Sequence, residues 1–315
     1  MVVLFSIKIN QQHQQHLKET FPTVSFIFKE NIDEAMDNVN EAEVLVGFGG
    51  QITESVIERA DNLKWIMIMA AGVDQLPKDI IREKNIRVTN ARGIHKTPMA
   101  EYAISMLLQV SRNERQQIEN QTAHHWKPVQ VDEMNGKTLL IAGTGAIGGE
   151  VARLAKAFNM KTIGVSRSGN KKENFDEVVT NQEMMPELQE ADFVVSVLPS
   201  TPETKHFFTY DHFKQMQVHT VFLNMGRGDV LDEDELIHAL REKEIGHVVL
   251  DVFETEPLPK DHFLWDEPNV TITPHMSGLS PYYTKRALTI FEHNLERFQK
   301  QQSDLMNEIN IMRGY

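Results

Sequence analysis

Short apolar runs alternate with amphipathic stretches from residue 1 to about residue 95. The runs are VVLFSIKI, VSFIF, AEVLVGF and KWIMIM, with a weaker one at IRVTN. The stretches between them predict helices around residues 11–20, 31–39, 53–60 and 75–84. This alternation predicts a parallel sheet covered by helices on both faces. The turn AAGVD at residues 70–74 follows the strand WIMIM, and its backbone N–H groups can hold a carboxylate; the alternative is a plain tight turn.

One long helix is predicted from Thr97 onward. Its first half is apolar almost all round, which is typical of a helix buried between domains or subunits, at Ala100, Ile104, Met106, Leu107, Leu108 and Val110. Its second half, SRNERQQIENQTAHH, is polar and is expected to reach solvent. The adjacent His124 and His125 have no third ligand, and neighbours on a helix point apart. We therefore expect a solvated pair rather than a metal site.

A glycine motif stands at the centre of the chain, in TLLIAGTGAIGGE at residues 138–150. An apolar run leads into Gly143-x-Gly145-x-x-Gly148, and a helical pattern follows. Strand, glycine turn and helix in this order are typical of dinucleotide binding. Gly143 would permit the tight turn, Gly145 would let the backbone approach a pyrophosphate, and Gly148 would let the helix lie close to the strand. The free N–H groups of the helix would face the phosphates. An ordinary glycine-rich β-turn-α unit is the alternative.

The next predicted strand, Lys161–Val165, ends in polar residues that bear on cofactor choice. A cofactor with a free ribose 2′-hydroxyl calls for Asp or Glu at this position. The chain instead has Ser166, Arg167 and Ser168, with Lys171 and Lys172 close behind. A guanidinium and two hydroxyls suit a 2′-phosphate, so this segment favours NADP(H) over NAD(H). The alternative is a surface arginine, with the acidic partner supplied from elsewhere.

Four further apolar runs end in chemically distinctive loops. FVVSVL leads to LPSTP, VFLNM to Gly226-Arg227-Gly228, HVVLDVF to a loop with Glu256, and VTIT to Pro274-His275. In an open parallel sheet, ligands bind at the carboxyl ends of the strands. Arg227, Glu256 and His275 are therefore expected to meet in one crevice beside the cofactor. Each residue taken singly has an ordinary interpretation as a loop residue.

Composition excludes several other classes of protein. The 315 residues are 41% hydrophobic and 24% charged, as in an ordinary globular protein. No apolar run approaches the length needed to span a membrane, and the N-terminus lacks the features of a signal peptide. There is no cysteine for disulfides or thiolate metal sites, so a cytoplasmic location is expected. The net charge of −13 disfavours nucleic acid as a partner.

The segments GVD, GTGAIG, LPSTPET, NMGRGDVLDEDEL, LDVFETEPLP and TPHMSG resemble the D-isomer-specific 2-hydroxyacid dehydrogenases, and the resemblance covers nearly the whole chain. It implies a two-domain α/β fold. A flavodoxin-like substrate domain would comprise residues 1–98 and 283–315, and a Rossmann nucleotide-binding domain would comprise residues 99–282. It also implies an active site in the cleft between the domains and a homodimer that packs through the nucleotide domain and its leading helix.

Site roles follow from the resemblance position by position. Arg227 would bind the substrate, Glu256 would be the carboxylate partner, and His275 the acid/base. Gly72 and Val73 would offer backbone N–H groups to the substrate carboxylate. The expected cofactor-binding residues are Gly143, Gly145, Ala146, Ile147, Gly148, Ser166, Arg167, Ser168, Pro199, Thr204, Met225 and Asp251. No metal site is predicted.

The predicted activity is the reduction of a small 2-oxo acid by NADP(H), as in the glyoxylate/hydroxypyruvate reductases that the Ser-Arg-Ser segment resembles. The cofactor would supply the hydride, His275 the proton, and Arg227 would orient the substrate. Two alternatives stay open, a nucleotide-sensing corepressor-like protein and a dehydrogenase of another small oxyanion such as phosphite. Formate is disfavoured because formate dehydrogenases of the family have Gln in place of Glu256.

Overall fold

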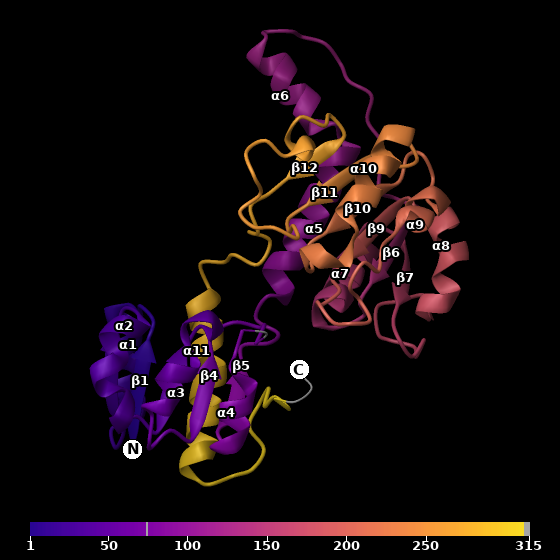
Figure 1. The fold of residues 1–315 in the computed structure, drawn as a ribbon. Coiled ribbons are helices and arrows are strands. Elements are labelled where there is room, and N and C mark those ends of the chain that lie inside the picture. The colour runs from indigo at the N-terminus through magenta and orange to yellow at the C-terminus, as the bar shows by residue number, and fades with distance from the viewer. Residues whose placement is uncertain (74, 312–315) are drawn as a thin grey trace. The chain divides into compact units, whose positions relative to one another are not determined.

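The protein forms two compact units in the computed structural model, which describes residues 1–73 and 75–311 (Figure 1). Unit 1 comprises Met1–His95 and Ser280–Tyr315, and unit 2 comprises Lys96–Leu279. The chain therefore leaves unit 1, builds all of unit 2 and returns. Asp74, the last residue of the expected carboxylate-binding turn, lies outside the described residues.

Unit 1 is built on a five-stranded parallel sheet in the order β2-β1-β3-β4-β5. The strands are β1 (Val2–Ser6), β2 (Ser25–Lys29), β3 (Val44–Gly47), β4 (Trp65–Ile68) and β5 (Arg87–Asn90). The helices are α1 (Gln11–Thr20), α2 (Ile32–Ala35), α3 (Glu54–Glu58), α4 (Lys78–Glu83) and α11 (Tyr283–Gln299), with 3-10 turns η1 (Met36–Glu41) and η2 (Gly49–Gln51). This strand order is that of flavodoxin-like folds, and it confirms the predicted parallel sheet.

The returning helix α11 completes the core of unit 1. The ring of Phe291 on α11 lies 5.3 Å from the Phe5 ring of β1 and 5.6 Å from the Trp65 ring of β4. All four residues of β3 and of β4 are buried, as expected for strands covered on both faces. The C-terminal segment therefore belongs to the same hydrophobic core as the N-terminal strands.

Unit 2 is a doubly wound sheet of parallel strands in the order β12-β11-β10-β9-β6-β7-β8. Its strands are β6 (Thr138–Ala142), β7 (Lys161–Val165), β8 (Glu177–Val179), β9 (Phe193–Ser196), β10 (Val221–Asn224), β11 (His247–Leu250) and β12 (Val270–Ile272). Its helices are α5 (Lys96–Ser111), α6 (Glu114–Thr122), α7 (Ala146–Ala157), α8 (Met184–Glu190), α9 (Tyr210–Gln215) and α10 (Glu233–Glu242). Strand order reverses between β6 and β9, the switch point at which such folds bind nucleotides.

One sequence prediction in unit 2 is wrong in detail, and one strand of the unit was not predicted. The long helix from Thr97 is broken, because Asn113 adopts a left-handed conformation with φ of 50° between α5 and α6. Asparagine tolerates this region better than most residues, which makes it a natural break point. His124 and His125 follow the end of α6, and both are exposed. The short edge strand β8 was not anticipated, because it begins with the exposed Glu177 and only Val179 is buried, which leaves no apolar run.

Candidate active site in unit 2

The glycine turn after β6 has the geometry that a pyrophosphate requires. Gly143 has φ of +106°, and its N–H donates to the Val165 carbonyl over 3.0 Å. A side chain at Gly148 would overlap the Gly143 carbonyl oxygen, so only glycine lets α7 start this close to β6. At Gly145, by contrast, no heavy atom lies within 4 Å of an added Cβ. Space is therefore open beside the backbone at the position where the motif calls for a ligand.

The first turn of α7 begins at Ala146 and Ile147, directly after this open space. The first N–H groups of a helix have no partner within the helix, and the helix dipole places positive potential there. No acidic residue occupies this first turn. The turn therefore fits the phosphates of a dinucleotide.

The end of β7 lies beside the same turn and carries Ser166, Arg167 and Ser168. The Ser166 hydroxyl is buried and has no hydrogen-bond partner within the described chain. Arg167 and Ser168 are exposed. The pKa of Glu203 is lowered, first by backbone and Thr201 hydrogen bonds and in smaller part by the charge of Arg167, so the guanidinium lies near the loop after β9. This end of β7 thus carries a guanidinium and a hydroxyl that has no hydrogen-bond partner in the described chain.

The loop after β9 is closed by its own side chains. The Thr204 hydroxyl donates to the Pro199 carbonyl over 2.5 Å and accepts from the Thr201 N–H over 2.9 Å. These contacts give the loop a fixed backbone beside the switch point. Met225 lies in the core of unit 2 with 1% of its surface exposed, so its side chain packs in the protein interior.

Arg227 sits in a turn that two glycines allow to pack closely. A Cβ at Gly226 would overlap the Leu198 carbonyl oxygen, and one at Gly228 would overlap the Phe253 carbonyl group. The Asn224 side chain clamps the turn by donating to the Arg227 carbonyl over 3.0 Å. The half-buried arginine is therefore held between the loops that follow β9 and β11.

His275 and Glu256 form a hydrogen-bonded pair at the carboxyl ends of β12 and β11. His275 Nδ1 lies 2.7 Å from Glu256 Oε2, and the other oxygen, Oε1, accepts from the Phe253 N–H over 3.0 Å. The carboxylate can only accept, so Nδ1 carries a proton and the second ring nitrogen is left for other partners. The histidine side chain is 51% exposed. An imidazole that is oriented by a carboxylate and open to solvent can exchange a proton with a bound molecule.

The Asp251 carboxylate lies in the protein interior and not on a surface that a ligand could reach. It is fully buried, and its carboxylate accepts from the Thr273 hydroxyl (2.6 Å), the Met276 N–H (2.8 Å) and the Ser277 N–H (2.9 Å). These residues flank His275. The carboxylate therefore holds the loop that carries the imidazole, a role that the sequence pattern did not indicate.

Gly72 and Val73 belong to unit 1, whereas all the other candidate site residues belong to unit 2. Their turn is held by Asn90, whose side chain donates to the Ala71 carbonyl over 2.5 Å. Val73 is buried, with 2% of its surface exposed.

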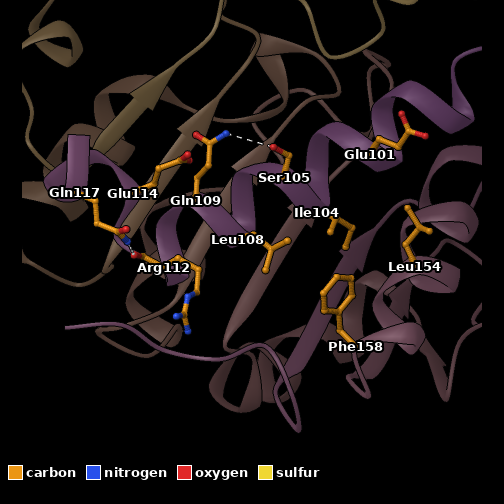
Figure 2. A pocket seen from close by; sticks show the side chains of 10 residues that line it. All are labelled: Glu101, Ile104, Ser105, Leu108, Gln109, Arg112, Glu114, Gln117, Leu154 and Phe158. Atoms are coloured by element: carbon orange, nitrogen blue, oxygen red, sulfur yellow. Dashed lines mark hydrogen bonds between the residues drawn. The ribbon is translucent and has the colours of Figure 1, made fainter. Parts of the chain in front are cut away.

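A pocket of about 600 Å³ lies elsewhere on unit 2, along α5, α6 and α7 (Figure 2). Its apolar part consists of Ile104, Leu108, Leu154 and Phe158. None of Arg227, Glu256 and His275 lines it. Within residues 1–73 and 75–311, His, Asp and Glu side chains form no group of three suited to a metal ion, and no helix is apolar over a length that could cross a bilayer.

A doubly wound parallel sheet, a glycine turn at its switch point and an imidazole–carboxylate pair on the same edge define a nucleotide-dependent oxidoreductase. Residues 104–277 match the sequence profile of the D-isomer specific 2-hydroxyacid dehydrogenase NAD binding domain. The chain therefore belongs to this family, and unit 2 contains its NAD-binding domain.

Individual relatives agree with this assignment. A D-3-phosphoglycerate dehydrogenase of Methanocaldococcus jannaschii is 34% identical over 84% of this chain, although the match spans only 51% of that longer protein. A solved D-isomer specific 2-hydroxyacid dehydrogenase family protein from Aeromonas salmonicida is 36% identical, with a TM-score of 0.90 over 98% of this chain and 99% of its own. An NADPH-dependent glyoxylate/hydroxypyruvate reductase from Sinorhizobium meliloti, solved with NADP and sulfate, is 26% identical, with a TM-score of 0.82 over 100% and 99% of the two chains.

Proposed function

We propose that the protein reduces a small 2-oxo acid with NADPH. The observation that carries this proposal is the 2.7 Å hydrogen bond between His275 and Glu256, on the same sheet edge as the glycine turn. Imidazole and carboxylate in this arrangement supply a proton to an oxygen on which negative charge develops. The similarity to a glyoxylate/hydroxypyruvate reductase supports a 2-oxo acid as the substrate class.

Each side chain has a defined task in this proposal. A bound reduced nicotinamide would supply a hydride to the carbonyl carbon. His275 donates the Nε2 proton to the carbonyl oxygen and keeps its Nδ1 proton, and the Nδ1–H donates a hydrogen bond to Glu256 before and after the transfer. Arg227 binds the carboxylate and polarises the carbonyl. The backbone N–H groups of Gly72 and Val73 are assigned, as part of the proposal, to the substrate carboxylate.

The preference for NADPH rests on the end of β7. Ser166 has a buried hydroxyl without a partner in the described chain, and Arg167 places a guanidinium beside it in sequence. A 2′-phosphate has the charge and the acceptor oxygens that these groups require. A carboxylate in place of the guanidinium should repel the 2′-phosphate of NADPH. It should still allow NADH to bind, because the 2′-hydroxyl of NADH is uncharged.

The test is NADPH and NADH oxidation across a panel of 2-oxo acids, including glyoxylate, hydroxypyruvate and pyruvate. Arg167→Asp should lower the NADPH/NADH ratio of kcat/KM by about 10- to 100-fold, as expected for a lost charge-assisted hydrogen bond. Lys214→Asp on α9 makes the same change of charge on an exposed residue outside the site and should leave the ratio unchanged. An unaltered ratio in Arg167→Asp refutes the cofactor assignment, and no turnover of any acid refutes the activity.

We also propose that the protein is a homodimer that associates through unit 2. Figure 1 shows α6 and the segment after it projecting from the rest of this unit. This projection exposes Ile118, Trp126 and Val131, with Trp126 fully exposed. Apolar side chains gathered on a projection are typical of a binding surface. Light scattering on Trp126→Ser and wild type should show weaker association in the variant; a monomeric wild type contradicts the proposal.

A further inference from the structure

A partly buried chain of hydrogen bonds connects helix α5 to the loop that carries His275. The Tyr102 hydroxyl on α5 lies 2.7 Å from the Thr273 hydroxyl, which lies 2.6 Å from Asp251 Oδ1. A carboxylate oxygen accepts only, so the Thr273 hydroxyl must donate to Asp251. Its single proton is then used, and Tyr102 must donate to Thr273. The direction of the whole chain is therefore set, from the phenol through the hydroxyl to the carboxylate.

Tyr102 is protonated at neutral pH, as its role as donor requires, and burial reinforces this. Burial, with a smaller contribution from the charge of Asp251, raises the pKa of Tyr102 above its ordinary value, and the hydrogen bond with Thr273 acts in the opposite sense. The phenol therefore remains a protonated donor at neutral pH.

The loop at the end of this chain needs external support. His275 has φ of +51°, a left-handed conformation that costs a residue other than glycine about 1–2 kcal/mol. Residues held in such conformations persist when their surroundings constrain them. Here the constraint comes from Asp251, whose carbonyl accepts the His275 N–H over 2.8 Å and whose carboxylate accepts from Met276 and Ser277.

We infer that Tyr102 is a positioning residue for His275, acting through Thr273 and Asp251. The inference rests on the proposed role of His275 as proton donor. The Tyr102 hydroxyl fixes the Thr273 hydroxyl so that its proton points at Asp251, and the fully buried Asp251 then holds the backbone on both sides of the imidazole. No hydrogen bond or ring contact among the described residues joins Tyr102 to His275 or Glu256, so its effect on turnover is indirect.

The test is Tyr102→Phe, which removes only the hydroxyl. Tyr210→Phe is the matched control, because the Tyr210 hydroxyl donates to Glu244 over 3.1 Å in a part of unit 2 outside the site. Amide hydrogen exchange is measured on wild type and on both variants without ligand. For a 2-oxo acid that the wild type reduces, kcat, KM and NADPH affinity are measured on the same three proteins. In Tyr102→Phe the amides of His275, Met276 and Ser277 should exchange about two- to tenfold faster, and kcat should fall by a similar factor. NADPH affinity should stay within about twofold of wild type, and Tyr210→Phe should show neither effect.

A double-mutant cycle with Thr273→Val tests the route of the effect. If Tyr102 acts through the Thr273 hydroxyl, Tyr102→Phe should add nothing to Thr273→Val in exchange or in kcat, whereas independent effects would multiply. The inference is overturned if these amides exchange in Tyr102→Phe at the wild-type rate. It is also overturned if they exchange faster while kcat of the active enzyme is unchanged. A wild type that turns over no 2-oxo acid refutes the proposed function alone, and the exchange rates then decide whether Tyr102 holds the loop.

Discussion

Two alanine substitutions in the glycine motif should separate packing from ligand binding. Gly148→Ala places a Cβ that overlaps the Gly143 carbonyl oxygen and lies 3.1 Å from Ile141 Cγ2. Backbone atoms must move to relieve this overlap, since no flexible side-chain end is involved. Gly145→Ala places the same methyl group where no heavy atom of the protein lies within 4 Å. The two variants are therefore chemically identical changes with opposite structural consequences.

The magnitudes follow from that contrast. Overpacking against a rigid backbone costs about 1–3 kcal/mol, and in a unit the size of Lys96–Leu279 each kcal/mol lowers Tm by about 2–4 °C. Gly148→Ala without ligand should therefore melt about 2–12 °C below wild type. Gly145→Ala should stay within about 2 °C, because alanine is a poorer N-cap than glycine by about 0.5–1 kcal/mol, and its lower chain entropy in the unfolded state offsets about 0.4–1 kcal/mol of that. Its methyl group instead blocks the approach of the pyrophosphate to the backbone.

Calorimetry without ligand and fluorescence titration with NADPH provide the two readouts. A saturating ligand at 100 times its Kd adds about 2.7 kcal/mol to stability, so wild type should show a clear upward shift in Tm with NADPH. Gly145→Ala should lose this shift while keeping its melting temperature without ligand. Gly49→Ala in unit 1, where the nearest atoms are at ordinary contact distance, serves as a control with neither effect. If Gly145→Ala binds NADPH as tightly as wild type, the cofactor does not approach the backbone at this turn.

Two further predictions concern histidines in unit 2. His275→Ala should lower kcat for 2-oxo acid reduction by about 10²–10⁴-fold with little change in NADPH affinity, and near-normal turnover would remove the acid/base assignment. His247, which is hydrogen-bonded to Thr271 over 2.9 Å, has its pKa lowered by burial, and to a lesser extent by Arg115, to about 4. The folded state therefore keeps this histidine neutral while the unfolded chain binds a proton below pH 6.5. The neutral His247 contributes fully to the free energy of unfolding above pH 6.5. As the pH falls from 6.5 towards 4, the free energy of unfolding decreases by about 3 kcal/mol on this account. Urea unfolding of His247→Gln from pH 7 to pH 4.5 should show a shallower decline than wild type, and parallel declines would contradict this.

The local pattern of the chain determined most of the architecture. Apolar runs followed by polar loops identified, apart from their exact ends, all the strands of the described residues except β8. Parallel strands buried on both faces must be continuously apolar, and this makes them visible in the sequence. The glycine spacing predicted the turn after β6, because a positive φ at Gly143 and the close contact at Gly148 exclude other residues. Arg227, Glu256 and His275 could be assigned to one sheet edge, because every strand that precedes them runs in the same direction.

Tertiary structure alone decided what holds those side chains in place. Nothing local marks Tyr102 among the apolar residues of α5, and its partner Thr273 lies 171 positions away in sequence. Asp251 matched a cofactor-binding position by resemblance, yet its carboxylate is buried against the His275 loop. The break at Asn113 likewise escaped the hydrophobic pattern, which reports burial and not backbone conformation. Periodicity records which face of an element is covered, whereas hydrogen-bond partners remote in sequence become definite only when the chain is packed.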